Sequence, residues 1–248
     1  FIFFKKKLIV ILFFVSLTIS SQTTQQLDEV VVSDSKINIP FSKNFRSIRV
    51  IDSKTIQETA ARNVIELLQS VTGLDIRRRG ISGTQADLYI RGGGFDQTLL
   101  LIDGMKMDDI QTGHHTLNLL LPVQLIERIE IIKGPAARIF GQNAFSGAIN
   151  IVTKPLKKSS NKVVEIYAND ISYGSYDHFN YSIKMRTSIE DKFNSLISFH
   201  KAKSDGYRYN TDFKNDFIFM KNNIKSKNGF IDIISGFSEK KFGANGFY

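Results

Sequence analysis

Residues 88–104 read Leu-Tyr-Ile-Arg-Gly-Gly-Gly-Phe-Asp-Gln-Thr-Leu-Leu-Leu-Ile-Asp-Gly. Two short apolar runs, residues 88–90 and 98–102, flank the three glycines, and the second run ends at Asp-Gly, a pair that favours a tight turn. A glycine-rich phosphate loop would require a helix directly after the glycines, whereas a second strand candidate follows them here. The glycines therefore predict tight turns and close backbone approach rather than nucleotide binding.

A small unit of mixed helices and strands is predicted around this stretch. Asn63 with Glu66 three residues later forms a capping-box variant that predicts a helix start, and Gly73 suits a left-handed helix end. We also expect short strands at residues 47–51, 126–132 and 148–153 and a brief helix at residues 136–140. This α+β unit occupies residues 46–156.

From residue 163 onward the pattern changes to alternation. Apolar Phe179, Tyr181, Ile183 and Met185 are separated by polar residues, so one strand face is apolar and the other polar. Runs of roughly ten residues match tilted strands that cross a membrane, although a soluble antiparallel sandwich with one solvated face has the same period. The predicted strands cover residues 163–167, 179–189, 193–199, 213–222 and 230–237.

The N-terminus indicates export. Three lysines at residues 5–7 precede the apolar run 8–17 and small polar residues at 18–21, the order of a secretory signal peptide. An anchoring helix is the alternative, but ten to twelve apolar residues fall short of the ~20 that span a bilayer. We therefore expect a signal peptide at residues 1–21. Because the first residue is Phe, we also expect the sequence to begin inside its gene.

Composition and charge exclude several classes of function. The 248 residues contain no cysteine, which rules out disulfides, thiolate metal sites and a cysteine nucleophile in this sequence. The net charge of +9 includes the three leader lysines, which leaves 9 − 3 = +6 spread along the chain, so we do not expect nucleic-acid binding. Ser146-Gly147 lacks the Gly-x-Ser-x-Gly turn of a hydrolase, and we predict neither catalytic residues nor a cofactor.

Four ordered blocks resemble the plug of TonB-dependent outer-membrane receptors. They are Leu-Tyr-Ile-Arg-Gly-Gly-Gly at 88–94, Thr-Leu-Leu-Leu-Ile-Asp-Gly at 98–104, Ile-Glu-Arg-Ile-Glu-Ile-Ile-Lys-Gly-Pro at 126–135, and Phe-Gly-Gln-Asn-Ala-Phe-Ser-Gly-Ala-Ile-Asn-Ile-Val-Thr-Lys at 140–154. The resemblance implies an α+β plug domain followed by antiparallel transmembrane β-barrel strands. Residues 157–248 would supply the first strands, and 22 strands are expected in the full-length protein.

The resemblance also implies a function in the outer membrane. Residues 205–213 and 242–248 look most like the cobalamin-receptor branch of the family. Energy-coupled uptake of a scarce bulky nutrient, a corrinoid or a metal chelate such as a ferric siderophore, is the implied activity. The implied partners are the TonB–ExbB–ExbD system, outer-membrane lipid and, as a candidate, a surface lipoprotein. A surface binding or signalling receptor on the same scaffold and a soluble periplasmic binding module are the alternatives.

A β-branched run near the start of the mature chain resembles the family's TonB box, within a flexible segment at residues 22–45. A mobile valine-rich segment can add as a strand to another protein's sheet edge through backbone hydrogen bonds. An ordinary edge strand of the plug is the alternative. The predicted TonB-binding residues are Asp28, Glu29, Val30, Val31, Val32 and Ser33.

Two further sets of site residues follow from the resemblance. Arg91 and Lys133 each precede a glycine at a strand end, where the family's basic plug residues pair with two barrel carboxylates; Lys133 stands where Arg is usual and cannot make Arg's two-point contact. The resemblance implies that the polar loop at residues 111–115 faces outward and touches substrate; an ordinary solvated loop is the alternative. Its two histidines alone leave a metal site short of ligands. The candidate substrate contacts are Gln111, Thr112, His114 and His115.

Overall fold

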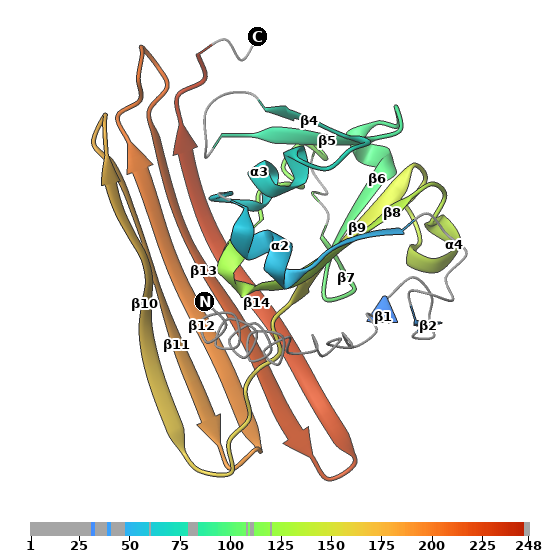
Figure 1. The fold of residues 1–248 in the computed structure, drawn as a ribbon, viewed down its shortest axis with the longest axis vertical. Helices are drawn as coiled ribbons and strands as arrows, with labels where there is room; N and C mark the ends of the chain where they lie inside the picture. The colour runs from blue at the N-terminus through green and yellow to red at the C-terminus, as the bar shows by residue number, and fades with distance from the viewer. Residues whose placement is uncertain are drawn as a thin grey trace, which may run out of the picture.

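The computed structural model describes residues 31–32, 39–40, 48–59, 61–78, 84–107, 109, 112–119 and 121–245. Figure 1 shows two parts: a unit of short strands and helices, and a sheet of long strands that curves along one side of it. We call residues 48–153 the N-terminal unit and strands β10–β14 the long-strand sheet. The predicted combination of a small α+β unit and long antiparallel strands is confirmed.

A mixed five-stranded sheet with the order β3-β8-β9-β6-β7 forms the centre of the N-terminal unit. β6 and β9 run parallel, and the other neighbours in this sheet are antiparallel. A separate two-stranded sheet pairs β4 with β5. The strands are β3 (Ile48–Ile51), β4 (Leu74–Arg78), β5 (Ala86–Ile90), β6 (Thr98–Ile102), β7 (Met105–Met107), β8 (Ile126–Lys133) and β9 (Gly147–Thr153).

The middle strands β8, β9 and β6 of the central sheet are buried on both faces, which explains why β6 is apolar from Leu99 to Ile102 rather than alternating. Leu100, Ile129 and Ile149 belong to a large core cluster that also contains Leu67 and Leu68 of helix α3 (Val64–Gln69). On the opposite face, a smaller cluster is formed by Leu99, Leu101, Ile132, Ala136, Ala144 and Ala148.

Helix α3 begins where side chains satisfy free amide groups. Asn63 Oδ1 accepts a hydrogen bond from the Glu66 amide at 2.9 Å, as predicted, and Glu66 Oε2 accepts one from the Arg62 amide at 2.9 Å. The predicted helix near residue 136 is α4 (Ala137–Phe140). No described helix is long and apolar enough to cross a membrane.

Helix α2 (Ser53–Glu58) and the two 3-10 helices η3 (Phe95–Gln97) and η4 (Val123–Leu125) were not predicted. Asp52 caps α2 by accepting a hydrogen bond from the Thr55 amide at 2.8 Å, and this bond holds the pKa of the Asp52 carboxyl below its usual value. Ile56 is the one buried residue of α2. A single buried residue produces no helical period in the sequence, so the pattern could not reveal this helix.

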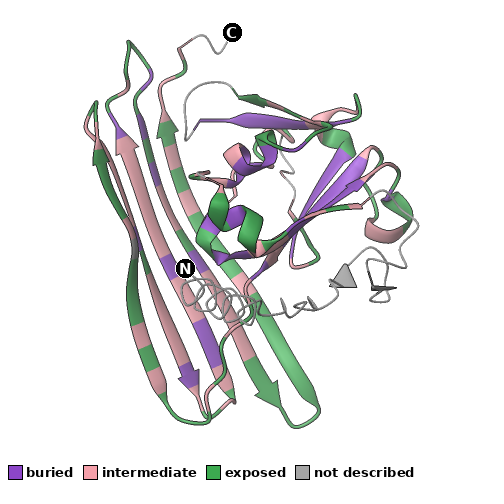
Figure 2. Cartoon of the chain, in the orientation of Figure 1, coloured by how far each residue is buried: buried purple, intermediate pink, exposed green. Residues whose placement is uncertain are grey.

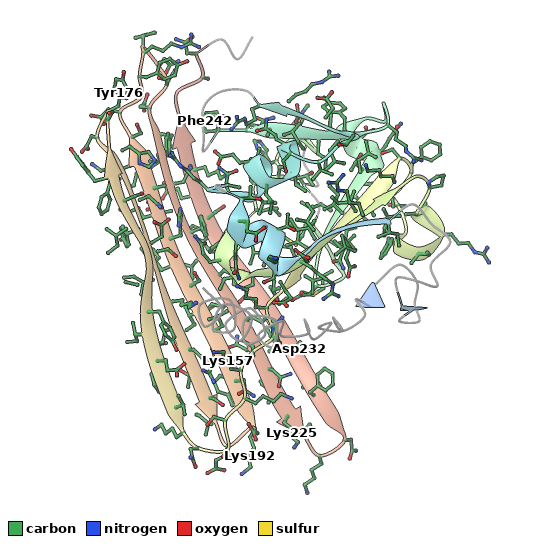
Figure 3. All side chains as sticks on the ribbon, viewed as in Figure 1. Lys157, Tyr176, Lys192, Lys225, Asp232 and Phe242 are labelled. Atoms are coloured by element: carbon green, nitrogen blue, oxygen red, sulfur yellow. The ribbon has the colours of Figure 1, made fainter. Side chains whose placement is uncertain are left out.

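The long strands exceed the lengths predicted from alternation. They are β10 (Val163–Gly174), β11 (His178–Ile189), β12 (Phe193–Ser204), β13 (Phe213–Ser226) and β14 (Gly229–Phe242), all paired with their neighbours in antiparallel order. A bulge between Ala168 and Asp170 shifts the alternation of β10, which explains why its second half was missed. Residues 205–212, between β12 and β13, form the longest turn of this sheet. In Figure 3, Tyr176 lies at the same end of the sheet as this turn, and Lys192 and Lys225 lie at the opposite end.

Strand register sorts the side chains of the long-strand sheet onto two faces. Residues that lie directly opposite each other, such as Ser198 and Phe219, share a face. The face toward the N-terminal unit is largely polar and contains the buried residues Ser182, Ser188, Asn194, Ser198 and Asn215. The outer face carries exposed apolar residues, including Ile166, Ile171, Ile183, Ile218, Ile233 and Phe237. Figure 2 shows that buried positions on this sheet are interspersed with exposed ones.

A buried polar network crosses the central sheet. Asn150 Nδ2 donates to Glu130 Oε2 at 3.0 Å, and Glu130 Oε1 accepts a hydrogen bond from Arg128 Nε at 2.8 Å. Asn150 Oδ1 accepts the Gly104 amide at 3.0 Å. Glu130 and Asn150 are almost completely inaccessible, so each hydrogen bond avoids the cost of an unsatisfied buried group.

Asn150→Leu should weaken the central sheet, because a side chain of similar size removes both hydrogen bonds of the amide. We expect a loss of about 2 kcal/mol, which corresponds to a roughly thirtyfold drop in amide protection along β8 and β9 in hydrogen exchange. Asn161→Leu, in the exposed segment before β10, is the matched control and should leave this protection unchanged. Unchanged protection in Asn150→Leu would contradict a stabilising role for the network.

Candidate functional site

The N-terminal unit contacts the polar face of the long-strand sheet through an apolar patch and polar bonds. Phe219 of β13 is 2% exposed and belongs to the same core cluster as Leu67 and Ile129 of the N-terminal unit. Leu196 of β12 and Ile234 of β14 pack against this cluster from the neighbouring strands. The two parts therefore share one hydrophobic core at this point.

A cavity of about 630 Å³ lies between the two parts, next to this shared core. Its wall on the N-terminal unit comes from residues 62–65 and from the segment that contains Leu117 and Leu121. The long-strand sheet contributes aromatic and polar side chains near its long-turn end. These include Tyr173, Tyr176, His178, His200, Phe217 and Lys240. The aromatic rings and the ammonium group together suit a large ligand with both apolar and polar surface.

The loop that contains the predicted substrate contacts is held by its own side chains. Asp109 Oδ2 accepts hydrogen bonds from Thr112 Oγ1 at 2.9 Å and from the Thr112 and His115 amides at 3.3 Å. His114 Nδ1 lies 2.9 Å from Oδ1 of the buried Asp87, and the imidazole stacks on Phe95 with ring centroids 4.1 Å apart. His114 thus packs against the N-terminal unit itself.

A hydrogen-bond chain links this loop to the long-strand sheet. His115 Nδ1 lies 3.0 Å from Asn118 Nδ2, and Asn118 Oδ1 accepts a hydrogen bond from Lys240 Nζ of β14 at 2.9 Å. Thr112, His114 and His115 are absent from the cavity wall, whereas Leu117 and Leu119 form part of it. Gln111 lies outside the described residues. The loop therefore borders the cavity through its second half.

Arg91 and Lys133 lie close together, and Arg49 of β3 joins them. Lys133 Nζ donates to the Thr72 carbonyl oxygen, and Arg91 approaches Gly134. Burial lowers the pKa of the Lys133 ammonium, and the positive charges of Arg49 and Arg91 lower it further. Within the described part of the chain, no carboxylate forms an ion pair with these three residues, which we call the cationic cluster.

The valine-rich leader is described only in part. Val31–Val32 forms a two-residue strand, β1, that pairs antiparallel with β2 (Ile39–Pro40). Asp28, Glu29, Val30 and Ser33 lie outside the described residues. The β conformation at Val31 and Val32 agrees with the strand preference of branched side chains.

The candidate metal-ligand side chains are dispersed among the described residues. Among the described residues, no group of three or more His, Asp or Glu side chains is close enough together to hold a metal ion. The histidines of the loop are each engaged with a neighbouring side chain rather than with one another. The site is therefore a contact between two parts of the chain with a ligand-sized cavity in it.

Sequence reasoning missed the residues of the long-strand sheet that touch the N-terminal unit. Lys221 and Lys240 occupy inward positions of their strands, as their pairing with Leu196 and Asn215 shows. Alternation could have placed both lysines on the polar face. It could not have shown which polar residues meet the N-terminal unit, because that depends on how the two parts are packed.

Comparison with known proteins agrees with this geometry. Residues 40–148 match the family model described as the TonB-dependent Receptor Plug Domain. The chain is 30% identical over 190 residues to the vitamin B12 transporter BtuB of Vibrio vulnificus, covering 77% of this chain and 30% of the relative. Its counterpart in Vibrio cholerae is 29% identical over 183 residues, covering 74% and 29%. The chain spans about a third of the length of these relatives.

Solved structures show the same fold. The ferripyoverdine receptor FpvA of Pseudomonas aeruginosa superposes with a TM-score of 0.67 at 11% identity, over 85% of this chain and 27% of that one. The siderophore receptor PirA of Acinetobacter baumannii superposes with a TM-score of 0.57 at 21% identity, over 79% and 32%. The N-terminal unit therefore belongs to the plug domains of TonB-dependent receptors, and the long-strand sheet that follows it has the fold of the antiparallel strands that accompany the plug in those receptors.

Proposed function

We propose that the intact protein is an outer-membrane transporter that imports a scarce, bulky nutrient of the cobalamin or ferric-chelate class. The observation that carries this proposal is a plug seated on the polar face of strands of 12–14 residues whose other face is apolar. A strand of that length extends roughly 40–45 Å and, tilted by about 45°, covers about 30 Å, the thickness of a bilayer's hydrocarbon core. The names of the relatives, a vitamin B12 transporter and siderophore receptors, support the class of cargo.

The N-terminal segments fit this location. We assign residues 1–21 to a signal peptide and residues 22–45 to a leader that carries the TonB box at residues 28–33. The plug occupies residues 46–156, and the barrel begins at residue 157. In this arrangement the box faces the periplasm, where the TonB–ExbB–ExbD system can pull on it while outer-membrane lipid surrounds the barrel.

The cavity is our candidate for part of the path that cargo follows. Thr112, His114 and His115, with Gln111, remain the proposed first contacts for cargo, and Asn118 connects their loop to Lys240 on the cavity wall. A surface binding receptor that passes cargo to a partner, such as a surface lipoprotein, would use the same site without energised uptake. Measuring uptake as well as binding separates the two functions.

The full-length protein should behave as a closed barrel that imports its cargo. We expect heat-modifiable migration on a gel, resistance to carbonate extraction from outer membranes, and TonB-dependent uptake of labelled cobalamin or of a ferric chelate. Cells that lack TonB are the control and should bind cargo without importing it. Extraction by carbonate would contradict the barrel, and binding that never leads to TonB-dependent import would favour the surface receptor.

Val31→Pro should abolish energised uptake while cargo binding stays intact. Proline has no amide hydrogen and so removes one donor from the ladder that the box would form with TonB. Val31→Thr, which keeps a branched side chain and the amide, is the matched control and should retain most of the uptake. Uptake that survives Val31→Pro would show that the box lies elsewhere.

Arg91→Gln should loosen the plug, because we expect two barrel carboxylates to face the cationic cluster. Removing one partner of a buried pair costs about 3–5 kcal/mol, so the plug should be released at a lower urea concentration. Limited proteolysis of the released plug measures this concentration. Arg138→Gln on the exposed surface of α4 is the control. Equal release from both variants would mean that Arg91 is a solvated charge.

A further inference from the structure

An ion pair whose two partners are 118 positions apart in the sequence joins the plug to the barrel sheet. Lys221 Nζ of β13 lies 2.8 Å from Asp103 Oδ2 and 2.5 Å from Thr153 Oγ1 of the plug. The side chains of Lys221 and Asp103 are only 13% and 19% exposed. This contact is therefore partly desolvated, unlike a surface ion pair.

The plug holds Asp103 in a fixed position. Asp103 adopts the left-handed conformation, with φ 48°, in the Asp-Gly turn that follows β6. Its carboxylate accepts hydrogen bonds from the Thr153 amide at 2.7 Å and from Thr153 Oγ1 at 2.6 Å, and its own amide donates to the Ile151 carbonyl at 2.9 Å. These bonds tie the end of β6 to the end of β9, so the negative charge cannot follow Lys221 if the barrel wall moves away.

The barrel surrounds Lys221 with apolar side chains. Leu196 and Ile234 lie directly opposite Lys221 on the two neighbouring strands, and both pack against the plug core. Phe219, two residues before Lys221 and on the same face, is buried in that core. A lysine among such neighbours is stabilised by a nearby carboxylate, because a charge removed from water without a partner is costly.

We propose that Lys221 is a latch residue: its ion pair with Asp103 holds the plug closed against the barrel wall and must open for cargo to pass. The inference rests on the proposed function, because it assumes that the plug moves relative to the wall during import. Any displacement of the β6 and β9 ends from β13 breaks this pair. The second polar contact, between Lys240 and Asn118, involves a neutral amide and supplies no opposing charge.

A double-mutant cycle in the full-length receptor tests the latch. Lys221→Gln and Asp103→Asn each remove one charge, and Asn tolerates the left-handed backbone at position 103. We expect each variant to raise the entry of a hydrophilic antibiotic too large for porins by roughly tenfold, and the double variant to add little further, as coupled partners do. Lys240→Gln, the matched control, should have a smaller effect.

A reversible tether tests whether the pair must open. Thr153→Cys with Lys221→Cys can be bridged by a short bis-thiosulfonate reagent that reductant removes. We expect the bridged receptor to bind cargo but to import it at less than a tenth of the unbridged rate, and reductant to restore import. The unbridged double-cysteine receptor is the control for the substitutions themselves.

Two results would overturn the latch: antibiotic entry that stays at the wild-type level in Lys221→Gln and Asp103→Asn, and full import by the bridged receptor. Heat-modifiable migration confirms in each case that the barrel has formed. If the wild-type receptor itself binds cargo without importing it, the proposed function fails. The antibiotic measurement still decides whether Lys221 holds the plug, since leakage does not depend on TonB or on cargo.

Discussion

Side chains of successive residues in a β-strand point to opposite faces, and the rest of this structure depends on that constraint. The register of β10–β14 places most serine and asparagine side chains on the face that meets the plug, together with Lys221 and the apolar patch around Phe219, and places the exposed isoleucines on the other face. A slip of one residue would exchange the two faces. The apolar side chains would then meet the plug, and Lys221 would point away from Asp103. The fold and the proposed transport function therefore rest on the same pairing.

Much of the fold could be predicted from local patterns because those patterns have local causes. Asn63 and Glu66 cap a helix through neighbouring amides, and the strict alternation of residues 179–189 follows from strand geometry. Helix α2 and the second half of β10 could not be predicted, since one has a single buried residue and the other contains a bulge. Sequence alone also gives no lengths for strands whose ends lie in polar turns, as β13 and β14 show.

The candidate site was harder to predict, because it arises where distant segments meet. Arg91 and Lys133 could be grouped through the family resemblance, but Arg49 joins them only through the pairing of β3 with β8. His114 stays a predicted ligand contact, but its contacts with Asp87 and Phe95 could not be predicted from the sequence. No local signal distinguishes a histidine that packs inward from one that reaches outward. In the same way, no local signal shows that Lys221 and Lys240 of the barrel sheet contact the plug.

The strand order of the plug has a consequence for how the protein is made. β9, the last plug strand in the sequence, lies at the centre of the sheet between β8 and β6. Until Gly147–Thr153 has left the ribosome, β6 and β8 have no common neighbour and their apolar faces stay uncovered. Such distant pairings form slowly and expose sticky surface in the meantime. A chaperone that shields unfolded chains would thus be needed most just before the first barrel strand emerges.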